Sequence, residues 1–113
     1  MVQPPFVDHC LELLAPLGAA RARRMFGGWG LYVDDSFMAL IAGEQLYLKV
    51  DDETREPFRA ADCRPFVYTG KGQPVTLSYW TAPADALDGP GPMAPWARLA
   101  LQAALRARGR SRR

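Results

Sequence analysis

Hydrophobic and polar residues alternate with a period of two in three consecutive segments near the middle of the chain. The alternation covers 29–33, 37–42 and 45–50, and it predicts three strands that each bury one face. The connections are 34–36 and 43–44. The second connection is a Gly-X pair, which is common in two-residue hairpin turns because glycine accepts the positive φ of a type II′ turn. We therefore expect a three-stranded antiparallel meander.

The same alternation assigns side chains to the two faces of this sheet. One face receives Trp29, Leu31, Val33, Phe37, Ala39, Ile41, Leu46, Leu48 and Val50, and the other receives Tyr32, Met38, Leu40, Tyr47 and Lys49. The second face is too apolar to be fully solvated. We expect a terminal helix to cover it. The alternative is a dimer or partner interface, which aromatic and methionine side chains suit.

The remaining segments predict helices and further strands. Apolar residues at helical spacing follow Pro4 and Pro5, and Pro16 and Gly18 end this first helix. A short helix is expected over 54–61, with Thr54 as N-cap and Pro57 tolerated in the first turn. Strands are expected over 20–26, 66–69 and 75–80, a Pro- and Gly-rich connector over 83–92, and a last helix from Pro95.

These elements define the fold class. The expected order is α-β-β-β-β-α-β-β-α, in an α+β domain with helices packed on an antiparallel sheet of about five strands. The order names six strands, and the count is about five because strand 20–26 can be continuous with strand 29–33. The length of 113 residues corresponds to one domain, assigned to 1–105, with a basic and disordered tail over 106–113.

Glycines and large aromatic residues are mixed in the segment from Met25 to Tyr32. A phosphate-binding loop would need a helix after the glycines, but a strand pattern follows them. We interpret the glycines as a bulge or sharp bend that redirects the strand, because glycine permits positive φ. Large rings would then pack on either side of the bend.

Four short motifs give the chain a resemblance to a known family. They are Met25-Phe26-Gly27-Gly28, Gly30-Leu31-Tyr32, the run Leu46-Tyr47-Leu48-Lys49-Val50-Asp51, and Ser78-Tyr79-Trp80. Together they resemble the N-terminal domain of the TfoX/Sxy family of competence regulators, over about residues 24–83 and more loosely through the last helix. The sequence departs from the family pattern at Asp62-Cys63 and at Leu77.

The resemblance implies a regulatory function rather than a catalytic one. Founding members of the family act with the cyclic-AMP receptor protein on DNA-uptake genes and carry a second, helical domain. We expect this chain to be a stand-alone form. The family motif marks candidate interaction residues, which are Met25, Phe26, Gly27, Gly28, Tyr32, Tyr47, Lys49, Tyr79 and Trp80.

The charge distribution adds a second candidate surface. The net charge of +2 includes Arg106, Arg108, Arg110, Arg112 and Arg113, without which 9 basic residues stand against 12 acidic ones. Basic tails bind phosphate backbones by releasing counterions. A nucleic-acid accessory role through this tail is therefore an alternative function, although a solvated end is the simpler interpretation.

The titratable residues predict no catalytic or metal site. The single histidine, His9, lies on the polar side of the first helix and is expected to be solvated, so Ser78 has no base. The adjacent acids at 34–35 and 51–52 are typical of turns and caps. Cys10 is expected in the core and Cys63 at the surface, both as reduced thiols.

We therefore expect a cytoplasmic, non-enzymatic regulatory or protein-interaction module without a cofactor. The N-terminus lacks a signal-peptide pattern and no apolar run is long enough to span a membrane. The expected partner is a protein such as a transcription regulator, with a homodimer as one alternative and nucleic acid as another. A small-ligand-binding domain or enzyme is the remaining alternative.

Overall fold

The computed structural model describes residues 3–25, 27–69, 72 and 74–111, and the structural statements below refer to these residues. The elements are α1 (Pro5–Leu14), η1 (Ala15–Leu17), β1 (Ala20–Met25), β2 (Gly28–Val33), β3 (Ser36–Ala42), β4 (Gln45–Lys49), α2 (Arg55–Ala60), β5 (Pro65–Thr69), β6 (Pro74–Thr81), η2 (Ala84–Asp88) and α3 (Pro90–Ser111). The predicted α+β class and element order are confirmed. The sheet has six strands rather than about five, because β1 and β2 are separate strands.

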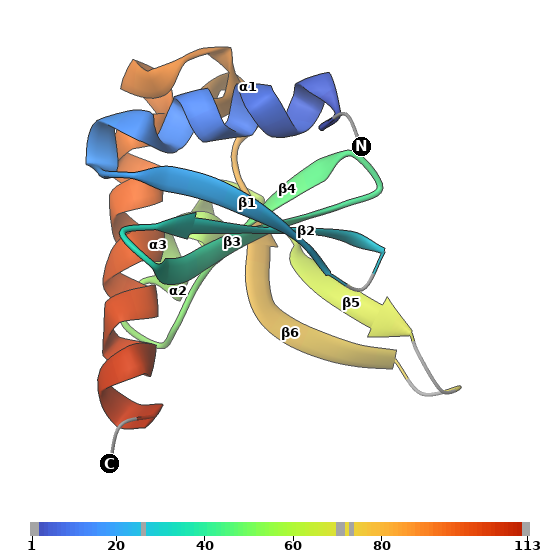
Figure 1. The fold of residues 1–113 in the computed structure, drawn as a ribbon. Coiled ribbons are helices and arrows are strands. Elements are labelled where there is room, and N and C mark those ends of the chain that lie inside the picture. The colour runs from blue at the N-terminus through green and yellow to red at the C-terminus, as the bar shows by residue number, and fades with distance from the viewer. Residues whose placement is uncertain (1–2, 26, 70–71, 73, 112–113) are drawn as a thin grey trace.

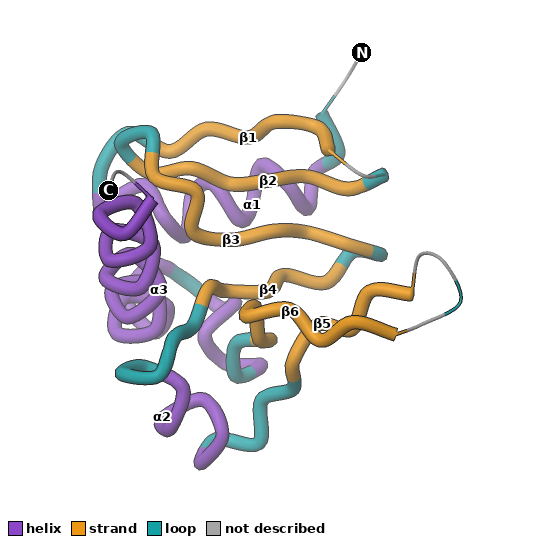
Figure 2. The backbone as a smooth tube through the Cα atoms, turned by 90° about the horizontal axis from the view of Figure 1, so that it is seen from below, coloured by secondary structure: helices purple, strands orange, loops and turns teal. Residues whose placement is uncertain are grey.

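All neighbouring strands of the sheet are antiparallel, in the order β1-β2-β3-β4-β6-β5. The first four strands form a meander. After α2 the chain forms β5, which is the edge strand of the sheet. It then returns along β6, which lies between β5 and β4 and pairs with β4 (Figure 2). The β5–β6 hairpin bends away from α1, so this end of the sheet curls (Figure 1).

The tight turns of the meander explain its register. Asp34 and Asp35 have φ of 48° and 67°, and Gly43 and Glu44 have φ of 57° and 59°. Two consecutive positive φ angles identify type I′ turns, whose twist matches that of the strands. The turn at Gly43 is therefore type I′ and not the expected type II′, although the hairpin lies where the sequence predicts it.

The core lies between one face of the sheet and the helices. Helix α1 contributes Val7, Cys10, Leu13 and Leu14, all at most 1% exposed. The sheet contributes fully buried leucines and valines, among them Leu31, Leu46 and Leu48, as the alternation predicts. Helix α3 runs past the strand ends and meets the core through small side chains, which are Ala97, Ala100 and Ala104 (Figure 1).

One strand breaks the predicted alternation. The β2–β3 register shifts so that Ala39 pairs with Leu31 but Phe37 pairs with Tyr32, which leaves Met38 as an extra residue. This β-bulge sends Met38 into the core, where it is fully buried, and Phe37 to the opposite face. The predicted faces of Phe37 and Met38 are therefore wrong, because period-two counting cannot detect an inserted residue.

The last helix is longer than the sequence predicts. It begins at Pro90 rather than Pro95, because prolines fit a first turn whose amides have no helical acceptor. It continues to Ser111, so Arg106 and Arg108 belong to a helix and not to a tail that starts at position 106. No helix in the described part of the chain has the length and apolarity needed to cross a bilayer.

Both cysteines are free thiols and both are buried. Cys10 is fully buried in α1, as predicted. Cys63 is 9% exposed, so its predicted surface position is wrong. It follows α2, where its amide donates to the Phe58 carbonyl, and this contact turns the chain back onto the core.

Candidate interaction surface

The glycine segment is a hairpin turn between two strands. Met25 pairs with Gly28, and Gly27 has a φ of 77°, a conformation that favours glycine. The predicted bulge or sharp bend that redirects the strand is therefore wrong in kind, because the chain reverses direction here between two antiparallel strands. Phe26, one of the predicted site residues, lies outside the described residues.

Two further glycines allow close packing beside this turn. A Cβ on Gly28 would lie 2.2 Å from the Ile41 carbonyl oxygen. A Cβ on Gly30 would lie 2.5 Å from the Met25 Cε atom and 3.0 Å from Phe37 Cε1. Gly28 therefore lets two strands approach, and Gly30 leaves space in which Met25 and Phe37 lie over the backbone.

The sheet face opposite α1 gathers aromatic rings from several strands. We call it the open face and define it by Met25, Tyr32, Phe37, Leu40, Tyr47, Phe66 and Tyr79. Ring centroids lie 5.1 Å apart for Tyr32 and Phe37, 5.6 Å for Phe37 and Tyr79, and 4.8 Å for Tyr47 and Phe66. These separations are typical of favourable aromatic pairs.

No helix among the described residues covers the centre of the open face, and Figure 2 looks directly onto the bare strands β1 to β4. The helical cover that we expect from the sequence is therefore wrong. The bulge in β3 matters here, because it adds the Phe37 ring to this face. The face is instead bordered by the curled β5–β6 hairpin.

A cavity of about 310 Å³ opens on this face. Its floor is formed by β2 and β3 and its wall by β5 and β6. The side chains that line it are almost entirely apolar or aromatic, and include Met25, Phe37, Leu40, Phe66, Tyr68 and Tyr79. Tyr68, at the rim, is 48% exposed. Such a lining suits an apolar group.

Cationic side chains lie against two of these rings. The Arg21 guanidinium lies 4.7 Å from the centre of Tyr32, and Lys49 Nζ lies 4.9 Å from the centre of Tyr79. Both contacts are within the range of cation–π attraction. Burial, and to a lesser extent the neighbouring Tyr32, raises the pKa of Tyr79 to about 12, so its hydroxyl stays protonated at neutral pH.

The structure brings together most of the predicted interaction residues, but not all of them. Met25, Tyr32, Tyr47, Lys49 and Tyr79 share the open face. Trp80 pairs with Leu48 and packs against the core on the other face, as alternation along β6 requires.

Sequence reasoning missed Phe37, Phe66 and Arg21 at this surface. Arg21 could have been found, because alternation along the expected strand 20–26 places it on the same face as Met25, and the structure pairs it there with Tyr32. Phe37 could not, because it depends on the bulge. Phe66 lies at a second register shift, in β5, which also escapes counting.

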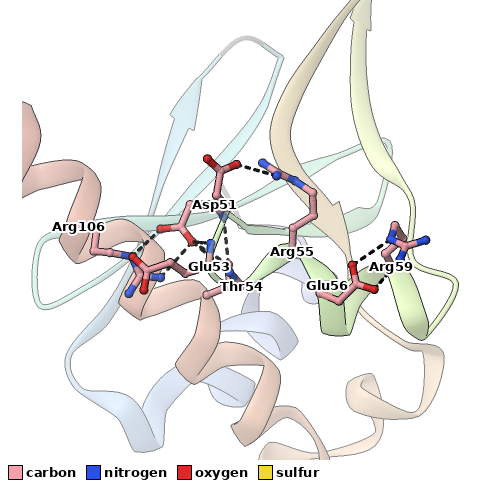
Figure 3. Close-up of polar contacts among 8 residues, drawn as sticks. Asp51, Glu53, Thr54, Arg55, Glu56, Arg59 and Arg106 are labelled. Atoms are coloured by element: carbon pink, nitrogen blue, oxygen red, sulfur yellow. Dashed lines mark hydrogen bonds and ion pairs between the residues drawn. The ribbon is translucent and has the colours of Figure 1, made fainter.

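The predicted nucleic-acid residues are partly engaged within the domain. Arg106 Nε and Nη2 donate to the two carboxylate oxygens of Asp51 at 2.6 and 3.0 Å, and Glu53 lies 3.3 Å from Arg106 Nε (Figure 3). Arg108 donates to the buried Ser36 hydroxyl at 2.9 Å. The side chains of Arg110, Arg112 and Arg113 are not among those described.

The adjacent acids have the structural roles that the sequence predicts. Asp51 Oδ1 accepts from the amides of Glu53 and Thr54, and it thereby organises the turn into α2 (Figure 3). Thr54 occupies the N-cap position, but its hydroxyl accepts from the Asp51 amide and does not cap the helix. Asp34 accepts from the Ala19 amide.

The remaining titratable residues include the single histidine. His9 is half-buried, with Nε2 2.8 Å from the Leu87 carbonyl oxygen, so it is not the solvated residue that we expect. Among the described residues, no three His, Cys, Asp or Glu side chains are grouped closely enough to hold a metal ion.

Comparison with known proteins identifies the family. A family model described as the TfoX N-terminal domain matches residues 12–104. The chain is 32% identical over 69 residues to Protein Sxy of Escherichia coli K12, covering 61% of this chain and 33% of that protein. It is 31% identical over 73 residues to DNA transformation protein TfoX1 of Aliivibrio fischeri, covering 65% and 35% respectively. The chain spans about a third of the length of these curated relatives. This chain belongs to the TfoX N-terminal domain family.

Proposed function

We propose that the domain is a non-enzymatic, cytoplasmic protein-interaction module with a regulatory function, and that it contacts its partner through the open face. One observation carries the proposal. Half-buried rings surround an apolar cavity on a sheet face that no described helix covers. Aromatic residues and methionine are enriched at protein interfaces, where they contribute large apolar area.

The name of one relative suggests a setting in which the domain acts. One relative is named a DNA transformation protein, which favours a role in DNA transformation for this chain as well. We therefore propose a transcription regulator as the first class of partner to test. The family resemblance motivates this choice, and the surface chemistry is compatible with it.

Quantitative affinity purification from the source organism tests the proposal. A tagged wild-type chain is compared with Tyr47→Ala and Tyr32→Ala, and with Arg98→Ala as the matched control on the exposed side of α3. We expect the two open-face variants to lose a defined partner by about fivefold or more, because truncating a central aromatic residue removes a hot spot.

Circular dichroism of each variant separates lost binding from lost folding. Tyr47 packs on Phe66, so Tyr32→Ala provides a second test at an independent site. Recovery of the same proteins in equal amounts by the wild type and both folded variants contradicts the proposal.

Nucleic-acid binding through the C-terminal arginines has less support. Arg106 and Arg108 already pair with Asp51 and Ser36, so these two guanidinium groups are partly neutralised or oriented toward the domain. Phosphate binding through them would compete with these contacts. Removing residues 109–113 and measuring salt-dependent DNA affinity distinguishes this function from the one proposed.

A further inference from the structure

The charges on the sheet are entirely of one sign. The six strands contain Arg21, Arg23, Arg24 and Lys49 but no Asp or Glu. The register places Arg21 opposite Tyr32, and Arg23 opposite Gly30, on the open face. The neighbouring carboxylates lie outside the strands. They are Asp34, Asp35 and Glu44 in the turns, of which Asp35 pairs with Arg21 at 3.1 Å, and Asp51 and Asp52, which follow β4 and line a polar pocket with Lys49.

Arg23 is a β1 cation on the same face as Met25, which lines the cavity. It precedes Met25 by two residues, so both side chains leave the same face of the strand. It is exposed and forms no ion pair with any residue that the structure describes. An incoming carboxylate would therefore gain this charge without displacing an internal partner.

The cavity volume limits what can fill it. About 310 Å³ is at the lower end of the range for small-molecule sites, and the lining offers few polar atoms to orient a free metabolite. An apolar side chain on a larger partner needs no such orientation, because the partner's backbone supplies it. One large aromatic or aliphatic residue anchored in a pocket is also the usual form of a binding hot spot.

We infer that the open face binds an acidic peptide segment of a partner protein, with one large apolar side chain in the cavity and flanking carboxylates against Arg23 and its cationic neighbours. This inference rests on the proposed interaction function and specifies the chemistry of the partner. The cations would align the segment and accelerate its encounter, while the rings of Phe37, Phe66 and Tyr79 would hold the anchor.

Selection from a random twelve-residue peptide library on the full chain provides the test. We expect the enriched peptides to contain Phe, Trp, Leu or Met within a few positions of Asp or Glu. For the best synthetic peptide, fluorescence anisotropy gives Kd as a function of salt. Replacing its acidic residues by Asn and Gln should weaken binding by about fivefold or more at low salt.

Protein variants locate the peptide on the surface. Arg23→Glu should raise Kd by about fivefold or more and reduce its salt dependence, whereas the matched charge reversal Arg98→Glu should not. Both positions are exposed, so neither change is expected to affect folding. Nuclear Overhauser contacts between the peptide's apolar side chain and the Met25 methyl group would place the anchor in the cavity.

Several outcomes overturn the inference while leaving the proposed interaction function intact. Enriched peptides that are basic, that lack a large apolar residue, or that bind Arg23→Glu unchanged would do so, as would a selection without binders. Light scattering that shows a dimer abolished by Arg23→Glu would mean that a second copy covers the face. A small apolar carboxylate that displaces the peptide and binds more tightly than it does would mean that the site is a metabolite site.

Discussion

At the scale of single residues, the glycines of the 25–30 segment have three different physical roles. Gly27 provides positive φ in the turn, Gly28 permits close approach of β2 to the Ile41 carbonyl, and Gly30 leaves room for Met25 and Phe37. Aromatic residues supply the buried area around them. The mixture of glycines and rings is therefore what a tight hairpin beside an aromatic cavity requires.

Gly28→Ala tests the close approach. The added methyl group would lie 2.2 Å from a backbone oxygen, so the strands must separate. We expect a loss of about 1–3 kcal/mol in the free energy of unfolding, measured by urea denaturation.

Gly109→Ala is the matched control for this substitution. Gly109 lies near the C-terminal end of α3, and a Cβ there would lie in open space. Its replacement should leave stability unchanged or raise it by up to about 1 kcal/mol, because alanine favours helix. Equal stability of Gly28→Ala and the wild type would show that the two strands are not in close contact.

At the scale of elements, an ion pair joins the C-terminal part of α3 to the turn that precedes α2. The Arg106 guanidinium beside Asp51, together with the Glu53 amide and the Thr54 hydroxyl, lowers the pKa of Asp51 to about 2 (Figure 3). A carboxyl group whose pKa is lower in the folded state than in the unfolded state stabilises the fold above the unfolded value, near 4. This stabilisation is lost as pH falls toward 2.

Asp51→Asn should therefore destabilise the protein by roughly 1–2 kcal/mol at pH 7. It should also reduce the loss of stability between pH 5 and pH 2, because the group that takes up the proton is absent. Thermal unfolding followed across this pH range measures both effects. Asp52→Asn is the neighbouring control, since the Asp52 side chain is 96% exposed and its ion pair with Arg55 contributes little. Identical pH profiles for the wild type and Asp51→Asn would contradict the assignment.

At the scale of the whole molecule, the two sides of the sheet differ in how they are covered. One side holds a continuous core with the helices, and the other presents rings around a cavity. This asymmetry is the physical basis of the proposed interaction function. It also predicts where reagents can reach the protein.

The reaction rates of the two thiols test how deeply the helix-covered side of the sheet is buried. Cys10 is fully buried, and burial raises its pKa to about 12, so almost no thiolate is present at pH 8. In Cys63→Ser, we expect Cys10 to react with a disulfide reagent only as fast as the protein unfolds, and fully in denaturant. In Cys10→Ser, the 9% exposed Cys63 should react faster. Modification of native Cys10 within the mixing time would contradict the described core.

Much of the fold could be predicted from local patterns. Strands over 29–33, 37–42 and 45–50 lie within one residue of the observed bounds, because period-two alternation and turn residues are local signals. The sequence also predicts Pro57 in the first turn of α2, and the structure confirms this position. The site was predicted less well, since it depends on which face of the sheet the helices cover.

The sequence by itself determined the α+β class, the element order, and the burial of Leu31, Leu46 and Leu48, because each follows from the spacing of neighbouring residues. Only the tertiary structure decided which face of the sheet stays open and where the bulge exchanges the faces of Phe37 and Met38. It also decided that Arg106 contacts Asp51 and that Arg108 contacts Ser36. These features depend on contacts between residues distant in the chain, and on one inserted residue whose effect local periodicity cannot register.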